Sequence, residues 1–432
     1  MTDTHDPLLT LEAALQRMLS DVLPLPAVEV PVDELLGSVL AADIRALHTL
    51  PPWDDSAMDG YAVRAADVAT ATHDSPVSLR VVGEVAAGHM ATASVMPGTA
   101  IRILTGAMLP PGADAVVRVE DTDAPAGVAA LPDRVAINVA AVTGTSVRPA
   151  GSDVRAGDLV LAAGSDLAAH RVGAIVAAGH GVASVHRRPR VAILSTGDEL
   201  MPPGARLRGA QIPDSSSVAL SAQVRDAGGQ PVALGIARDD RPDIVARLHR
   251  GIEDADIVVA SGGVSVGAHD EVRLAFEEVG HIDLWRVAIQ PGKPLAFGRA
   301  RDQGGRQVQL FGLPGNPVSS FVTFELFVRP LIRRMAGHVD LVGRTIVRAR
   351  LANAVRTDQG RRAYLRVRLA QDAQGQWLAS LAGGQGSHML SGLAAADGLA
   401  IVPQGIGELD AGVEVDVISF GPGSQAYPPV VA

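Results

Sequence analysis

Residues 190–200 read RVAILSTGDEL, and this stretch decides the fold. Its first half is an unbroken apolar run, which is typical of a short strand buried on both faces of a sheet. Its second half, from Thr196 to Leu200, is a polar loop that contains a glycine. Because ligands bind beyond the carboxyl ends of parallel strands, this loop is a candidate site.

The same pattern repeats through residues 188–338. Strand-like runs (231–240, 256–263 and 282–289) alternate with helical runs (218–229, 242–255, 271–280 and 316–337). Such alternation predicts a central, doubly wound and mostly parallel sheet that is covered by helices on both faces. The chain is therefore expected to be a multidomain α/β protein.

Two regions with β patterns flank the sheet domain. Residues 51–159 alternate short valine-rich runs with Gly, Pro and Asp turns, which predicts an inserted β-rich domain. Residues 343–425 return to strand patterns after the last long helix. We expect a small C-terminal domain there, resembling a β-barrel.

A helical unit is predicted to carry the insertion. Residues 10–22, 32–42 and 166–180 show apolar residues at helical spacing. We expect them to pack together as a helical N-terminal and linker domain, formed by residues 1–50 and 160–187. The β-rich domain would then separate the two halves of this helical domain.

Composition excludes several classes of protein. The net charge of −10 and the aromatic content of 3% argue against a nucleic-acid binder, which is normally basic and offers aromatic rings for stacking. The absence of cysteine excludes disulfides, thiolate metal sites and cysteine nucleophiles. The acidic N-terminus and the lack of about 20 consecutive apolar residues predict no signal peptide and no membrane span, so we expect a cytoplasmic protein.

Lys293 is the only lysine among the 37 lysine and arginine residues. A position that keeps lysine in such a chain is a candidate for a crowded anion site, which accepts a compact ammonium but excludes a planar guanidinium. Chance survival of one solvated lysine is the alternative. The turn that holds Lys293 follows a predicted strand, which favours the anion site.

Four loops follow predicted strands and converge on one edge of the sheet: 196–200, 261–267, 290–294 and 312–319. In the last loop, Asn316 is placed to cap the following helix, and Pro317 suits its first position. The helix N-terminus and the glycine-rich 261–267 loop both offer backbone N–H groups to an anion. Each loop alone is readily explained as an ordinary turn, and their joint placement favours an anion site.

Carboxylates follow the same edge, at Asp198, Glu199, Asp239, Asp240 and Asp270. Carboxylates repel phosphates unless a metal ion lies between them, and Mg²⁺ typically binds one or two carboxylates together with substrate phosphate. The pattern therefore predicts Mg²⁺, although Asp198, Asp239 and Asp240 are also explained as solvated turn residues. The histidine spacing predicts no zinc site, and no serine hydrolase elbow is present.

Six motifs occur in an order that resembles one family. They are SAMDGYA (56–62), ILTG (103–106), STGDEL (195–200), SGGVSVG (261–267), PGKP (291–294) and GLPGNP (312–317). Over residues 10–420 the chain is similar to the molybdopterin molybdenumtransferases, the bacterial MoeA proteins that are related to the E domain of gephyrin. The combination of SAMDGYA, TGDEL and GLPGNP is highly specific.

The resemblance implies a fold and a reaction. The sheet domain would be of the molybdopterin-binding type, and the protein would insert molybdenum from molybdate into adenylylated molybdopterin with release of AMP. The resemblance also implies Mg²⁺ and an elongated homodimer, whose cleft lies between the sheet domain of one subunit and the inserted domain of the other. This chain has Gln290 where the family often has lysine, and an arginine-rich stretch is reduced to Arg148 and Asp153.

The resemblance also assigns roles to residues. Asp59, Glu199, Asp270 and Lys293 are the expected catalytic residues, with Glu199 and Asp270 near the metal. The expected substrate-binding residues are Thr105, Arg148, Asp153, Thr196, Asp239, Gly262, Gly263, Ser265, Pro314, Gly315, Asn316, Pro317 and Ser387. Positioning and charge neutralisation would supply most of the catalysis.

Two alternative functions come from other classes. A molybdopterin adenylyltransferase would share the sheet domain, but such proteins are usually shorter and lack SAMDGYA. A gephyrin-like scaffold would use the dimer surface instead of the cleft, and the intact acidic and glycine-rich motifs argue against it. A molybdenumtransferase is expected to contact molybdopterin adenylyltransferase and apo-molybdoenzymes, but no nucleic acid and no membrane.

Overall fold

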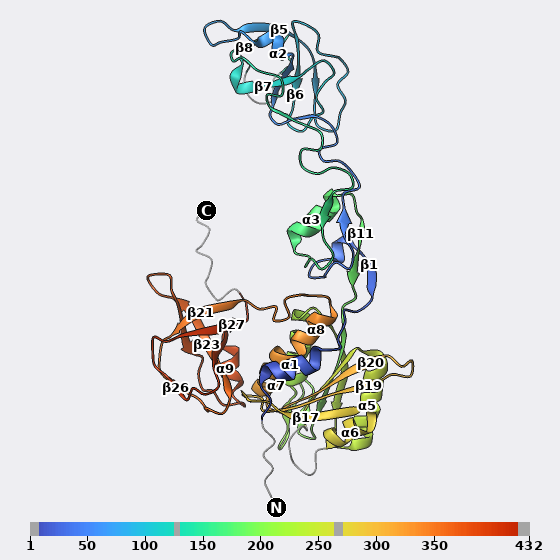
Figure 1. The fold of residues 1–432 in the computed structure, drawn as a ribbon, viewed down its shortest axis with the longest axis vertical. Coiled ribbons are helices and arrows are strands. Elements are labelled where there is room, and N and C mark those ends of the chain that lie inside the picture. Colours follow the sequence, from blue (N-terminus) through green and yellow to red (C-terminus); the bar gives the residue numbers. More distant parts are fainter. Residues whose placement is uncertain (1–7, 125–129, 263–270, 422–432) are drawn as a thin grey trace, which may run out of the picture.

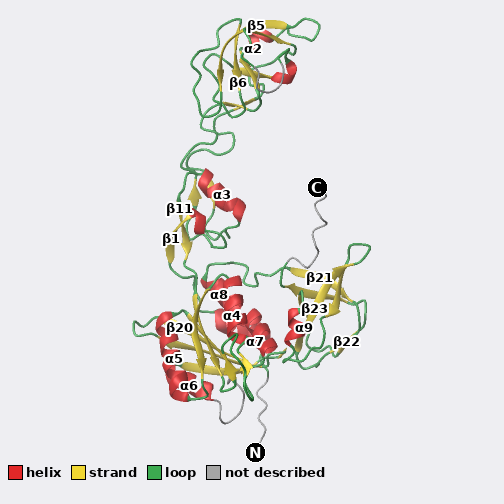
Figure 2. Ribbon diagram, turned by 180° about the vertical axis from the view of Figure 1, so that it is seen from behind, coloured by secondary structure: helices red, strands yellow, loops and turns green. Residues whose placement is uncertain are grey.

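The computed structural model describes residues 8–124, 130–262 and 271–421. The molecule is elongated (Figures 1 and 2). The inserted domain lies at one end, the sheet domain and the C-terminal domain lie at the other, and the linker joins the two ends. Within these residues, no helix combines the length and the apolar character that a membrane span requires.

The sheet domain contains six strands in the order β15-β12-β16-β20-β19-β17. They are β12 (Arg190–Thr196), β15 (Gln230–Ala237), β16 (Ile257–Ser261), β17 (His281–Arg286), β19 (Pro294–Arg301) and β20 (Gln307–Leu313). The first four in this order are parallel, whereas β19 runs antiparallel to both of its neighbours. The sequence patterns missed β19, because Gly298 interrupts its apolar run. A Cβ atom at Gly298 would lie 2.2 Å from the carbonyl oxygen of His281, so the close strand pairing requires glycine.

Helices cover both faces of this sheet. They are α4 (Ser216–Asp226), α5 (Arg241–Asp254), α6 (Glu271–Val279), α7 (Pro317–Thr323) and α8 (Arg329–Met335). Val224 of α4 and Val322 of α7 are buried against one face, together with α8. Leu248 of α5 and Phe276 of α6 are buried against the other face. The alternation of strands and helices predicted from the sequence therefore produces a sheet with a separate apolar core on each face.

A π-helical turn, η3 (Phe324–Val328), joins α7 to α8 into one long helical rod. Pro330 follows this turn and has no N–H group to continue the regular i→i−4 pattern. A π turn inserts one extra residue, which accommodates such a break without ending the helix.

The first helix, α1 (Leu11–Leu19), packs on the sheet domain. Thr10 caps it by accepting a hydrogen bond from the backbone N–H of Ala13 at 3.1 Å. The buried residues Ala14 and Met18 belong to the same core as α4 and α8. The expectation that this helix packs with the linker helix is wrong, because the sheet domain covers its apolar face.

The linker is not a helical domain, contrary to the expectation. Residues 32–42 form only a 3-10 turn, η1 (Val32–Glu34), because Gly37 has a φ of +76°, which a continuing helix does not adopt. The other elements are β1 (Ala27–Pro31), β2 (Ile44–Arg45), β10 (Leu159–Leu161), α3 (Ala169–Ala177) and β11 (Val182–His186). β1 pairs with β11 and β2 pairs with β10, so antiparallel strands join the two halves of the linker.

The inserted domain is rich in β-structure, as its valine-rich runs predict. Its main sheet has the order β7-β4-β6-β5-β8. The strands are β3 (Asp55–Ser56), β4 (Gly60–Val63), β5 (Val77–Val85), β6 (Thr99–Ile103), β7 (Ala115–Arg118), β8 (Arg134–Ile137) and β9 (Val147–Arg148). Apolar clusters lie on both faces of the main sheet, and the short β3–β9 pair is separate from it.

The C-terminal domain is a closed barrel, which confirms the barrel-like prediction. Its strands are β21 (Ile346–Leu351), β23 (Arg362–Gln371), β24 (Trp377–Leu381), β25 (Gly398–Val402) and β27 (Glu414–Ser419). They pair in the order β23-β24-β21-β27-β25, and the ring closes between β25 and β23. A short strand that follows β17, β18 (Ile289–Gln290), pairs with β23 and brings the barrel against the sheet domain.

Short elements complete the described fold. They are α2 (Ala65–Val68), η2 (Val119–Asp121), β13 (Leu200–Met201), β14 (Ile212–Pro213), β22 (Val355–Arg356), α9 (Leu390–Ala394) and β26 (Glu408–Leu409).

Candidate active site

A pocket of about 1110 Å³ opens at the carboxyl edge of the parallel strands. β12 stands there between β15 and β16, so the chain winds away from β12 in opposite directions. Open α/β sheets bind their ligands at such a switch point. The predicted site residues that line the pocket are Thr196, Glu199, Asp239, Gly262, Gly315, Asn316 and Pro317. Pro314 lies next to this lining in the chain, between the end of β20 and Gly315.

Two buried hydroxyl groups in the pocket lining have no hydrogen-bond partner among the residues that the structure describes. They belong to Ser195, which is fully buried, and to Thr196, which is 6% exposed. An unpaired buried hydroxyl costs about 1–3 kcal/mol, so most are paired in folded proteins. These two groups therefore favour a polar ligand at the end of β12.

Glycines allow the loops of the pocket to approach one another closely. Gly262 has a φ of +108°, and a Cβ atom there would lie 2.7 Å from Oγ1 of Thr196. Gly197 has a φ of +150°, and a Cβ atom there would lie 2.5 Å from the carboxylate of Glu199. A larger residue at either position would displace a side chain that lines the pocket.

Glu199 and Asp239 bring two carboxylates to the pocket. Asp270, Gly263 and Ser265, which were also predicted to act here, lie outside the described residues. In the described part of the chain, no three acidic or histidine side chains gather as a metal site. Mg²⁺ needs only one or two protein carboxylates when substrate phosphate supplies further oxygens. The carboxylates present therefore fit Mg²⁺ that is bound together with a phosphorylated substrate.

The start of α7 differs from the prediction. Pro317 occupies the first turn as predicted, but the Asn316 side chain makes no capping hydrogen bond and lines the pocket instead. The N–H of Val318 donates to the carbonyl oxygen of Ser387 at 3.2 Å. A loop of the barrel thus takes one of the N–H groups that were expected to face an anion, and its next residue, His388, lines the pocket.

Several lining residues were missed from the sequence: Asp214, Ser215, Ser216, Glu271, His388 and Leu390. Asp214 accepts a hydrogen bond from the N–H of Ser217 at 3.0 Å, at the start of α4. An aspartate and a serine before an apolar helical run were the available signal for this helix start. His388 comes from another domain, and no local pattern predicts its approach.

Lys293 lies in the turn before β19, outside the pocket lining. Its carbonyl oxygen accepts a hydrogen bond from the N–H of Val287 at 2.9 Å. A hydrogen bond from Arg361 is the main cause that lowers the pKa of Asp358 in the barrel, and the charge of Lys293 adds to it. Near this turn, the side-chain oxygen of Gln290 is buried without a partner. The lone lysine is therefore placed at the junction between the sheet domain and the barrel.

The predicted residues of the inserted domain form a second group. Oδ1 of Asp59 accepts hydrogen bonds from the N–H and the hydroxyl of Thr105, both at 2.7 Å, which lowers the pKa of Asp59. Arg148 donates to Asp55 at 2.6 Å. Asp153 follows Arg148 closely in the chain, and its N–H donates to the carbonyl oxygen of Leu50 in the linker. Figure 1 shows that the inserted domain and the sheet domain lie at opposite ends, so one chain does not bring this group to the pocket.

Comparison with known proteins assigns the chain to a family. Residues 9–179 match the family model of the MoeA N-terminal region (domain I and II), and residues 348–420 match that of the MoeA C-terminal region (domain IV). Residues 192–334 match a probable molybdopterin binding domain. The chain belongs to the MoeA family. The pocket of this MoeA chain lies in the region that matches the molybdopterin binding domain and is completed by the C-terminal region.

Relatives cover nearly the whole MoeA chain. Molybdopterin molybdenumtransferase 2 of Mycobacterium tuberculosis is 40% identical over 396 residues, which are 90% of this chain and 94% of the relative. Molybdopterin molybdenumtransferase of Haemophilus influenzae is 32% identical, over 96% of this chain and 99% of the relative. The crystal structure of a molybdopterin biosynthesis moeA protein from Pyrococcus horikosii is 35% identical, covers 96% of this chain and 100% of that chain, and has a TM-score of 0.78.

Proposed function

We propose that this MoeA chain inserts molybdenum from molybdate into adenylylated molybdopterin and releases AMP, in the last step of molybdenum cofactor biosynthesis. The observation that carries the proposal is the polar pocket at the switch point of a chain whose full-length relatives are molybdopterin molybdenumtransferases. Both proposed substrates are anions, and this pocket has the groups to bind them.

The pocket residues have separate tasks in this proposal. The free hydroxyls of Ser195 and Thr196 donate hydrogen bonds to phosphate or molybdate oxygens. Gly262 lets the backbone approach the substrate closely, because no side chain stands between them. Holding the two substrates in one place converts their encounter into a reaction within a single complex, which supplies a large part of the rate.

Mg²⁺ is the proposed cofactor. Glu199 would hold it, together with Asp270, and the ion would neutralise the phosphate oxygens of the bound substrate. Asp239 is a third carboxylate on the same edge and is proposed to contact the substrate. Without such an ion, these carboxylates would repel the anionic substrate that the hydroxyls attract.

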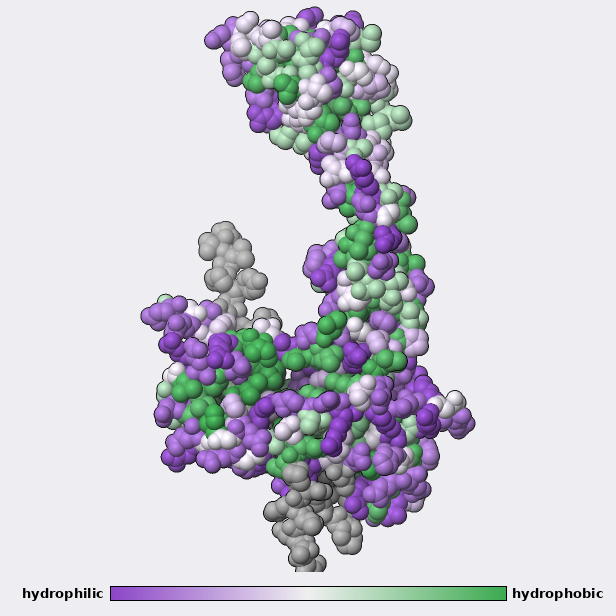
Figure 3. Space-filling model, in the orientation of Figure 1, coloured by the Kyte–Doolittle hydropathy of each residue, from purple (hydrophilic) through white to green (hydrophobic). Residues whose placement is uncertain are grey.

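We also propose a homodimer with a shared cleft. Asp59 accepts two hydrogen bonds from Thr105, and Arg148 pairs with Asp55 in the same domain, but these residues lie far from the pocket of their own chain. A second copy would bring them to that pocket. Figure 3 shows apolar surface along the linker. The exposed apolar residues of the linker include Leu36, Leu47, Leu159, Val176 and Val182, and a dimer contact along the linker would cover apolar surface.

The alternatives predict different products. A molybdopterin adenylyltransferase would consume ATP and molybdopterin, and it would not need the inserted domain or the barrel that this chain carries. A scaffold would turn over neither substrate. The test is to incubate the purified protein with adenylylated molybdopterin, molybdate and Mg²⁺, and to measure AMP and active cofactor. AMP and active cofactor together support the proposal, and their absence rejects it.

The proposed setting follows from the reaction. The substrate is supplied by an adenylyl transfer to molybdopterin, and the product is consumed by apo-molybdoenzymes, so transient contacts with both kinds of protein are expected. We propose a cytoplasmic location on the same ground. Preference for molybdate over tungstate would be read from the same assay with either oxyanion.

A further inference from the structure

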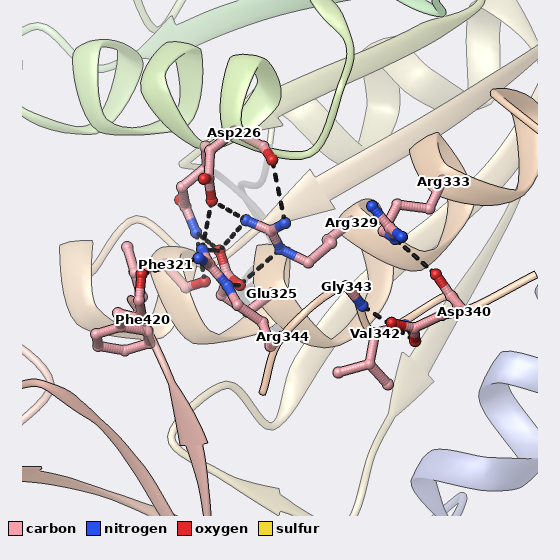
Figure 4. A network of polar contacts seen from close by, with 11 residues as sticks. Asp226, Phe321, Glu325, Arg329, Arg333, Asp340, Val342, Gly343, Arg344 and Phe420 are labelled. Atoms are coloured by element: carbon pink, nitrogen blue, oxygen red, sulfur yellow. Dashed lines mark hydrogen bonds and ion pairs between the residues drawn. The ribbon is translucent and has the colours of Figure 1, made fainter. Parts of the chain in front are cut away.

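A group of four charged residues, with its centre buried, joins the sheet domain to the barrel (Figure 4). Asp226 ends α4, Glu325 lies in η3, Arg329 begins α8 and Arg344 precedes β21. The side chains of Glu325 and Arg329 are each 1% exposed and that of Arg344 is 12% exposed, whereas that of Asp226 is 51% exposed. Glu325 is the buried carboxylate of the group, so removing Arg329 or Arg344 takes away one of the positive charges that compensate it.

Arg344 connects the two ends of the barrel to the helices of the sheet domain. Its Nε and Nη2 donate to the carboxylate of Glu325 at 3.1 and 3.4 Å, and Nη2 also donates to Asp226. Its Nη1 donates to the carbonyl oxygen of Phe420 at 3.1 Å, and its guanidinium lies 5.9 Å from the centre of the Phe420 ring. Arg344 stands just before the first barrel strand and Phe420 just after the last. One side chain thus holds the entry and the exit of the barrel.

Further contacts make this anchor rigid on the side of the sheet domain. Arg329 donates to Glu325 at 2.7 Å and also contacts Asp226. Gln223 of α4 donates to Glu325 at 2.8 Å. Phe321 of α7 meets the Phe420 ring edge-on, with 5.2 Å between the ring centres. The Glu325 carboxylate, which accepts from Arg344, is therefore also held by Gln223 of α4 and Arg329 of α8.

The helices that hold Arg344 begin at the pocket. Ser216 at the start of α4 and Pro317 at the start of α7 both line it. The barrel supplies the facing residues His388 and Leu390. The sheet domain and the barrel thus meet at two places. One is the group of charged residues around Arg344, and the other is the pocket, which both domains line.

Other contacts also join the sheet domain and the barrel. Tyr364, Leu399 and Ile418 of the barrel belong to the same buried apolar core as the helices of the sheet domain. β18 pairs with β23 over only two residues, and Arg362 pairs with Glu12 at 2.7 Å on the surface. The anchor at Arg344 lies in a different part of the barrel and adds charged contacts to this interface.

We propose that Arg344 is a positioning residue for the pocket. By clamping the entry and exit of the barrel to Glu325 and Asp226, it fixes the place of loop 387–390 across the substrate site. A lysine cannot replace it fully, because one ammonium does not span two carboxylates and a carbonyl in the fixed geometry of a guanidinium. The effect on turnover rests on the proposed function, whereas the position of the barrel is measured without any substrate.

The test measures the distance between the sheet domain and the barrel. The natural chain has no cysteine, so His249→Cys on α5 and Gln374→Cys in the barrel create two unique sites for spin labels. Both residues are exposed. Pulsed electron paramagnetic resonance is recorded on labelled chain diluted with unlabelled chain, so that only distances within one chain contribute. We expect Arg344→Met to make the distance distribution at least about twofold broader than in the otherwise natural protein.

Arg306→Met is the matched control. Arg306 bonds to Asp302 at 2.8 Å and to carbonyl groups within the sheet domain, so its loss removes an arginine from an ion cluster that does not include the barrel. An unchanged distribution in Arg344→Met, or an equal broadening in Arg306→Met, would overturn the proposal. If Arg344→Met does not fold, Arg344→Lys decides, with a smaller broadening expected and an unchanged distribution counting against the clamp.

Kinetics give the second readout. We expect Arg344→Met to raise the KM for adenylylated molybdopterin about tenfold, because the facing wall of the pocket is no longer held in place. A broader distance distribution with an unchanged KM would contradict the role in positioning the pocket. Failure of the natural protein to release AMP would reject the proposed function and leave the distance result standing.

Discussion

Asp59 and Thr105 are held together by two hydrogen bonds to one carboxylate oxygen, from the N–H and from the hydroxyl of Thr105, each 2.7 Å long. Both bonds stabilise the charged carboxylate, and they lower the pKa of Asp59. Asp59 therefore stays negatively charged at neutral pH while it presents its second oxygen to whatever approaches this end of the inserted domain.

Thr105→Val tests this pairing. The substitution removes the hydroxyl donor and keeps the backbone donor, so we expect the pKa of Asp59 to rise part of the way to its usual value. Because a lowered carboxyl pKa stabilises the fold only above that pKa, the contribution of the natural pair is lost as the pH falls through it. Nuclear magnetic resonance titration of the Asp59 side chain measures the shift. An identical titration in both proteins would show that the hydroxyl does not act on the carboxylate.

Glu199→Gln tests the carboxylate of the pocket. The side chain keeps its size and loses its charge, so we expect AMP release to fall about 100-fold or more while the thermal midpoint changes little. Asp198→Asn is the control, because it makes the same change at the exposed neighbouring residue, which is absent from the pocket lining. Equal losses in the two variants would contradict a specific role for Glu199.

We expect His338 to make the stability of the sheet domain depend on pH. Burial and the nearby charge of Arg333 lower its pKa below the ordinary value of 6.5, and they outweigh the opposite effect of the contact with Asp166. A lowered histidine pKa means that the unfolded chain binds the proton more tightly. Stability is therefore complete above about pH 6.5 and falls as the pH drops toward the lowered pKa.

His338→Gln should reduce this dependence. We expect the thermal midpoint of the variant to fall less between pH 7 and pH 5 than that of the natural protein, because a neutral amide takes up no proton. Differential scanning calorimetry at the two values measures the difference. A parallel fall in both proteins would place the pH dependence in other groups.

The roles of Lys293 and Gln290 in anion binding remain predictions. If Lys293 is a compact anion ligand, Lys293→Arg should weaken molybdate binding about tenfold, although the charge is kept. Gln290→Lys restores the residue that the family often has, and we expect it to be tolerated and to tighten binding of molybdate or phosphate. Calorimetric titration with molybdate and with phosphate gives the order of affinities of four proteins: the natural protein, Lys293→Arg, Lys293→Ala and Gln290→Lys. Lys293→Arg that binds and turns over normally would make the lone lysine an accident of base composition.

Regular elements were predictable where the residue pattern was clear. One of the valine-rich runs of the inserted region is β5, and the apolar run that opens the stretch 190–200 matches β12 closely. The pattern misled where a glycine governs the backbone. Gly298 hid β19 because close pairing excludes a side chain, and Gly37 ended a helical pattern after a single short turn.

The pocket was predictable in part, because strand ends are local features. Thr196, Glu199 and Gly262 follow parallel strands, and the topology of the sheet places them together. The resemblance assigns Ser387 of the barrel to the substrate site, but the role of its neighbour His388 was missed, since its approach depends on how a separate barrel is anchored. The same holds for α1, whose helical spacing was readable but whose packing partner is more than a hundred residues away in the chain.

The central claim is that one active cleft uses Asp59 of one subunit and Glu199 of its partner, and mixed dimers test it most directly. Asp59→Asn and Glu199→Gln are each expected to be inactive alone. When the two differently tagged variants are unfolded together and refolded, half of the dimers should be mixed, and each mixed dimer has one cleft with both natural residues. The account predicts that AMP release returns to about one quarter of the natural rate, and to about half in purified mixed dimers. Purified mixed dimers that stay inactive would contradict the shared cleft.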